Sequence, residues 1–143
     1  MTFNADLEPL TYFGPELAKV CVAVGWLDRE MPFTTGPSDS VVFRRLQELL
    51  RDPFEPFVAG GAHRCNLCQL DPEQSGGANL LVPAEELLFV APALILHYVN
   101  AHHYQLPISF AEAVLKCPDT RSTEYKRQFL QAGGREIMRL GQG

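Results

Sequence analysis

Two cysteines and two histidines in the middle of the chain have the types and spacings of a metal site. Cys65 and Cys68 are separated by two residues, as in a zinc knuckle, and His97 and His102 are separated by four. Zn²⁺ prefers thiolate and imidazole ligands, and two of each complete its tetrahedral shell. Two thiolates also balance the charge of the ion, so such a site can be partly buried. We therefore predict one structural Zn²⁺ held by these four residues.

The histidine pair leaves some alternatives open. His103 follows His102 directly and is a substitute for it, and His63, beside the knuckle, is a weaker one. A straight helix turns by about 140° over five residues. We therefore expect the helix to end or bend between His97 and His102, so that both rings face one ion.

Other interpretations give these residues a different role. Buried cysteines and a helical histidine can simply pack in a core, and a Cys-x-x-Cys pair can be a redox pair. The redox interpretation is disfavoured because no strand precedes the pair and no long helix follows it, as they do in thioredoxin. Cys21 and Cys117 lie in apolar stretches without a partner motif, so we interpret them as packing residues.

A catalytic zinc is the main enzymatic alternative. In that case Cys65, Cys68 and His97 would hold an open Zn²⁺, and His102 would act as the base. The His-x-Glu and Pro-Cys-x-x-Cys signature of zinc deaminases is missing from the sequence. The metalloprotease His-Glu-x-x-His, the hydrolase Gly-x-Ser-x-Gly and the phosphate-binding Gly-x-x-x-x-Gly-Lys are missing too. We therefore favour a binding function over a zinc-dependent hydrolase, and we assign no catalytic residue.

A hairpin and a helix between the two ligand pairs are expected to bring them together. Residues 79–82 and 86–90 read as two short strands around a turn at Pro83–Ala84, with Glu85 and Glu86 as a solvated pair. Pro92 suits the first turn of a helix that runs through His97 towards Tyr104. The order of knuckle, strands and helix places two distant ligand pairs around one ion.

The remaining elements complete an α+β domain over residues 1–143. Residues 1–15 look irregular, residues 17–24 alternate as a strand does, and residues 54–58 read as a short extended piece. Ser38, Asp39 or Ser40 can cap a helix over 41–51. Ser109 and Glu112 form a capping box for a helix that ends near Cys117. A helical tail (120–143) starts its helix near Ser122, is interrupted at Gly133–Gly134 and resumes to Leu140.

Composition is that of a soluble folded protein. The chain has 143 residues, of which 46% are hydrophobic and 20% are charged, close to the averages for a single globular domain. The N-terminus lacks the features of a secretory signal, and the uncharged stretch from Leu87 to Tyr104 holds too many polar groups for a membrane span. We expect a cytoplasmic protein whose four cysteines form no disulfides.

The charge balance and the spacing of the ligand pairs disfavour a nucleic-acid-binding function. The net charge is −5, and an acidic chain repels phosphate backbones. The 28 residues between the pairs also exceed the linker of about 12 in compact nucleic-acid fingers. Basic residues outnumber acidic ones six to three from Lys116 to Arg139. We interpret that region as a solvated helix face, with a nucleic-acid-associated accessory protein as the alternative.

A closed zinc site on a small domain usually fixes loops for a binding surface. Trp26, Phe33, Tyr98 and Tyr104 are the aromatic candidates for that surface, since exposed aromatic residues are enriched at interfaces. Core packing is the competing interpretation, and we favour it for Trp26. We expect a protein partner and no membrane association, and leave a homodimer open.

The motifs of the central region resemble a family of small uncharacterised bacterial proteins. The resemblance rests on Gly-Ala-His-Arg-Cys-Asn-Leu-Cys ending at Cys68, Asn-Leu-Leu-Val-Pro from Asn79, and Val-Ala-Pro-Ala-Leu-Ile-Leu-His-Tyr from Val90. It spans about residues 20–118. Members tend to carry glycine at the position of His103, which implies that His102 is the matching ligand. The family implies no activity, so it supports the site and leaves the function open.

Overall fold

The central sheet forms from the most apolar stretches of the chain. In the computed structural model it contains β1 (Cys21–Ala23), β4 (Asn79–Ala84) and β5 (Leu87–Pro92). The middle strand, β5, is parallel to β1 and antiparallel to β4. Nearly all residues of β4 and β5 are buried, as in strands covered on both faces. The structure describes residues 3–11, 14–55, 63–68, 75–76 and 78–142.

The hairpin between β4 and β5 turns two residues later than the sequence suggests. Pro83 and Ala84 belong to β4, where Pro83 pairs with Leu88, and the turn lies at Glu85 and Glu86. The predicted turn at Pro83–Ala84 is therefore wrong. An edge strand tolerates proline because one side of its backbone needs no ladder donor. Glu85 has a φ of 53°, a left-handed conformation that closes the turn, and both glutamates are exposed as expected.

The described part of the N-terminal segment, residues 3–11, lies alongside β1. Its backbone is irregular, as predicted, yet isolated β-bridges attach it to the region of β1, at Asn4–Trp26 and Pro9–Val22. The strand predicted from residue 17 is shorter in the structure. Leu17–Lys19 forms a 3₁₀ turn (η1), and the strand begins at Cys21.

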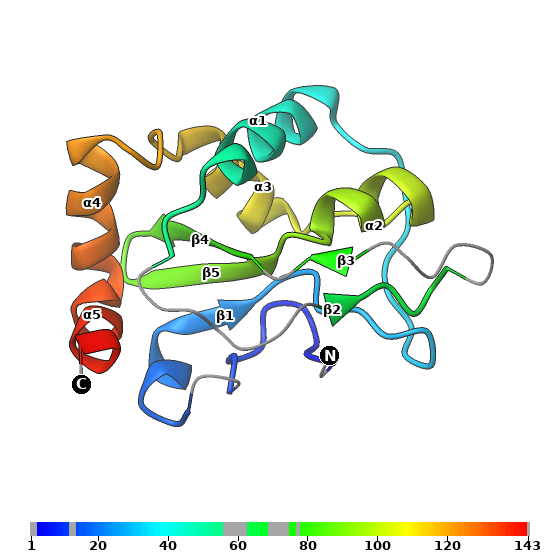
Figure 1. Ribbon diagram of the computed structural model, residues 1–143. Helices are drawn as coiled ribbons and strands as arrows, with labels where there is room; N and C mark the ends of the chain where they lie inside the picture. The colour runs from blue at the N-terminus through cyan, green and yellow to red at the C-terminus, as the bar shows by residue number, and fades with distance from the viewer. Residues whose placement is uncertain (1–2, 12–13, 56–62, 69–74, 77, 143) are drawn as a thin grey trace.

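Three helices gather on one side of the sheet in Figure 1: α1 (Ser40–Arg51), α2 (Ile95–His102) and α3 (Ile108–Lys116). The side chain of Asp39 caps α1 by accepting from the N–H groups of Val41 and Val42, so that predicted helix is confirmed. The predicted capping box of α3 is wrong. The helix follows Pro107 without a side-chain cap, which places Ser109 inside its first turn.

Pro92 also differs from its predicted place. It is the last residue of β5, and α2 begins at Ile95, because the strand pairing with Asn79 holds Pro92 in the sheet. Of the extended piece predicted over 54–58, residues 56–58 lie outside the described residues. Phe54 packs edge-on against Phe129, with ring centroids 5.2 Å apart.

The C-terminal region forms α4 (Thr123–Phe129), a π-helical turn η2 (Leu130–Gly134) and α5 (Arg135–Gln142). Ser122 caps α4 by accepting from Tyr125 N–H, and Gly133, with a φ of 113°, kinks the chain as predicted. The Tyr125 hydroxyl donates to the carbonyl oxygen of Leu81 in β4 at 2.6 Å. This hydrogen bond attaches the C-terminal helices to the sheet edge.

The core contains three of the four aromatic side chains that were interface candidates in the sequence. Trp26, Tyr98 and Tyr104 are all 0% exposed, so they are not available to a partner, while Phe33 is half-buried. Their apolar bodies fill the space between β5, α2 and the N-terminal segment, where Trp26 Nε1 donates to Val90 O at 2.9 Å. Core packing, the competing interpretation, holds for these three residues. The predicted α+β class is confirmed.

Candidate metal centre

The cysteine pair lies at the end of a short two-stranded ladder. β2 (His63–Arg64) pairs antiparallel with β3 (Ser75–Gly76), and Cys65 follows β2 directly. Cys65 is 3% exposed and Cys68 is half-buried. Both cysteines lie next to α2, with their Sγ atoms close to its histidine rings.

The histidine pair lies on α2, which the β4–β5 hairpin positions next to the ladder (Figure 1). His97 is in the first turn of α2 and His102 is its last residue. The helix does not end or bend between them, so that expectation is wrong. Five helical residues rise about 7.5 Å, and two long imidazole side chains can span this distance. Their ring centroids lie 5.0 Å apart, with the ring planes at 82°.

The four potential ligand atoms converge, all within 4.8 Å of one another. Cys68 Sγ lies 3.1 Å from His97 Nε2 and 3.3 Å from His102 Nε2. Cys65 Sγ lies 3.5 Å from His102 Nε2. A tetrahedral Zn²⁺, with bonds of about 2.3 Å to sulfur and about 2.0 Å to nitrogen, separates such ligands by about 3.5 Å. The cluster has the dimensions of a four-coordinate site, and its residues could hold a metal ion.

The electrostatics of the cluster favour its metal-binding form. Burial lowers the pKa of His102, and the charges of His97 and His103 lower it further. A lower pKa favours the neutral imidazole, the form that binds a metal. The sulfur of Cys65 is buried, and a buried thiolate needs a compensating charge.

The alternative ligands differ in how the structure places them. His103 is the C-cap of α2 and adopts a left-handed conformation, with φ 56° and ψ 28°. Glycine is the usual residue at such a position, because it adopts the left-handed conformation without steric cost. His103 is not part of the cluster, and the side chain of His63 lies outside the described part of the chain.

Tyr98 lies behind the cluster on the same helix. Its side chain is fully buried, and its hydroxyl has no hydrogen-bond partner among the described residues. Burial raises its pKa, and the charges of Cys65, Asp28 and Cys68 raise it further. The hydroxyl is thus within electrostatic range of both sulfurs.

Asn66, between the two cysteines, is a residue that sequence reasoning missed. Its side chain accepts from the backbone N–H of Arg29 at 3.1 Å and donates to Asp28 Oδ2 at 3.2 Å. Asparagine often fixes turns through its side-chain amide, and that signal was available in the sequence. Its partners, 37 and 38 residues away, were not.

Cys21 and Cys117 are separate from the cluster. Both are buried, as expected for packing residues, and burial raises the pKa of Cys21 to about 11 and that of Cys117 to about 12. They therefore remain thiols at neutral pH and are poor metal ligands.

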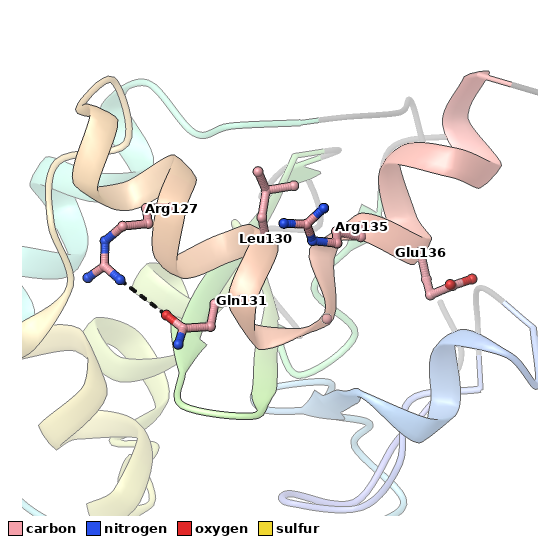
Figure 2. A pocket seen from close by; sticks show the side chains of 6 residues that line it. Arg127, Leu130, Gln131, Arg135 and Glu136 are labelled. Carbon is pink, nitrogen blue, oxygen red and sulfur yellow. Dashed lines mark hydrogen bonds between the residues drawn. The ribbon is translucent and has the colours of Figure 1, made fainter.

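Among the described residues, three of the six basic residues from Lys116 to Arg139 form ion pairs with carboxylates. Arg127 pairs with Glu124 on α4, and Arg139 pairs with Glu136 on α5. Figure 2 shows that Arg127 also donates to Gln131, beside an open groove that Glu136 lines. Guanidinium groups that are paired with carboxylates attract phosphate only weakly.

Fold and cluster together define a small α+β domain with a four-residue cysteine and histidine centre. The chain belongs to the family described as a domain of unknown function (DUF7919), whose model matches residues 2–115. The matched region contains the whole cluster, whereas α4, η2 and α5 lie beyond it. Comparison with curated proteins and with solved structures gives no match. No helix in the described residues is long and apolar enough to cross a membrane.

Proposed function

We propose that this protein is a zinc-binding domain in which one structural Zn²⁺ joins the cysteine knuckle to α2. The observation that carries the proposal is the convergence of Cys65, Cys68, His97 and His102, with all ligand atoms within 4.8 Å of one another. Two thiolates and two imidazoles favour zinc over the oxygen-seeking Mg²⁺ and Ca²⁺. A reducing compartment such as the cytoplasm keeps both thiols available.

A structural ion is favoured over a catalytic one. His102 Nε2 lies 3.3 and 3.5 Å from the two sulfurs, which suits a fourth ligand better than a base that acts on a bound water. Four protein ligands close a tetrahedral shell, and catalytic zinc keeps a position open. The zinc hydrolase alternative therefore has no observation in its favour.

We further propose that the surface around the zinc site binds a protein partner. Closed zinc sites on small domains order loops at the surface, and three of the four cluster residues are half-buried, so the centre lies near solvent. Nucleic acid is a less suitable partner, because the chain carries a net charge of −5 and two arginines of its C-terminal helices, Arg127 and Arg139, are paired with glutamates.

Metal content tests the site. We expect about one zinc per chain by plasma mass spectrometry on protein without a histidine tag. Cys65→Ser should lose the zinc and melt at a lower temperature, because the free energy of metal binding adds to the free energy of folding. Cys117→Ala, which removes a buried cysteine outside the cluster, is the matched control and should keep the metal. Full zinc content and an unchanged melting temperature in Cys65→Ser would contradict the proposal.

A further inference from the structure

The cysteine pair is connected to the loop after β1 by side-chain hydrogen bonds. Asn66 accepts from Arg29 N–H and donates to Asp28 Oδ2. The other carboxylate oxygen of Asp28 accepts from Glu30 N–H at 2.9 Å. The turn between the two metal-binding cysteines is therefore held against residues 28–30.

The histidine pair is connected to the same N-terminal region by a second set of bonds. Tyr104, two residues after His102, is fully buried and its hydroxyl donates to Asp6 Oδ2 at 2.7 Å. Asp6 Oδ1 accepts from Gly25 N–H at 3.0 Å. The backbone beyond α2 is also held, since His103 O accepts from Gly36 N–H at 3.0 Å.

The N-terminal region that makes both connections is itself attached to the sheet. The backbone N–H of Leu10 donates to Cys21 O at 2.9 Å, and that of Ala23 donates to Glu8 O at 2.9 Å. Trp26 Nε1 donates to Val90 O in β5, the strand that leads into α2. Residues 4–10 and 25–36 thus connect the sheet, the knuckle and the end of α2.

We propose that Asn66 and Tyr104 are positioning residues that hold the two ligand pairs at metal-binding distance, through Asp28 and Asp6 of the N-terminal region. The inference rests on the proposed function, since it concerns the affinity of the same centre. Outer partners that orient metal ligands typically contribute about 10- to 100-fold to metal affinity. Preorganised ligands also lose less conformational entropy when the ion arrives.

Matched variants of the full chain separate positioning from general stability. Asn66→Ala and Tyr104→Phe each remove one connection. Asn100→Ala removes an exposed asparagine of α2, and Tyr125→Phe removes the buried hydrogen bond to Leu81 O, at the sheet edge. Asp6→Asn is a second, milder change on the histidine side, should Tyr104→Phe fail to fold.

Zinc affinity is measured by competition with a chromophoric chelator, and the visible spectrum of bound Co²⁺ reports the coordination geometry. Asn66→Ala and Tyr104→Phe, or Asp6→Asn, should bind zinc about 10-fold more weakly and broaden the Co²⁺ bands, while the two controls match the wild type. Equal weakening in Tyr104→Phe and Tyr125→Phe, or wild-type affinity in both connection variants, would overturn the inference and leave the zinc site intact. A wild-type chain that binds neither metal would instead overturn the proposed function.

Discussion

The sheet and the metal centre are stabilised in different ways. β4 and β5 pair over six residues each and are almost wholly buried, whereas β2 and β3 pair over two residues each. Three of the four cluster residues are half-buried, and the hydrogen bonds of Asn66 with Asp28 and Arg29 are exposed. Apolar burial holds the sheet without help from an ion, whereas a ladder of two residues per strand supplies few hydrogen bonds to hold the knuckle. The comparison predicts that the sheet stays folded without metal, at a lower overall stability, and that the centre depends on the ion.

A truncation in the core should have the largest effect on stability and should not depend on metal. Phe110 is fully buried on α3, with its ring centroid 5.5 Å from that of Phe89 in β5. Phe110→Ala should lower the free energy of unfolding by about 3–5 kcal/mol, because the cavity adds to the lost burial. Urea unfolding with saturating zinc and with excess chelator should give the same loss. A loss that disappears in chelator would show that the core and the centre are one unit.

Substitutions of the adjacent residues His102 and His103 should have very different effects on zinc affinity. His102→Ala should weaken zinc binding by more than about 100-fold, since even outer partners contribute about 10- to 100-fold. His103→Gly should keep the affinity and raise stability by up to about 1 kcal/mol, because glycine suits the left-handed C-cap. Competition titration and thermal melting measure the two effects. Equal metal loss in both variants would mean that the end of α2 rearranges around the ion.

Alkaline pH should weaken the core by a smaller amount. Burial raises the pKa of Cys21 from its ordinary 9.0 to about 11, so the unfolded chain loses this proton at lower pH than the folded one. The stabilisation by the buried thiol is complete below pH 9 and is lost as the pH rises towards 11, by about 1 kcal/mol at pH 10. Urea unfolding of the wild type and of Cys21→Ala from pH 8 to pH 10 measures it. The variant should show the shallower decline, and parallel curves would exclude Cys21 as the cause.

The local parts of the fold were largely predictable. The cap at Asp39, the interruption at Gly133 and the strand patterns of β4 and β5 depend on residues within one or two turns of each other. The errors arose where tertiary contacts override local preference. Pairing between β4 and β5 keeps Pro83 and Pro92 in strands, and the aromatic residues Trp26, Tyr98 and Tyr104 are buried in the core.

The sequence by itself determined which side chains can bind a metal, because ligand chemistry belongs to the residue type and the spacing of each pair is local. The convergence of Cys65 and Cys68 with His97 and His102 was decided by the tertiary structure, since the hairpin and α2 must dock on the ladder before the pairs can meet. Contacts across 38 residues, from Asn66 to Asp28, and across 98 residues, from Tyr104 to Asp6, support that meeting. No local pattern encodes such contacts, because they result from the packing of the whole chain.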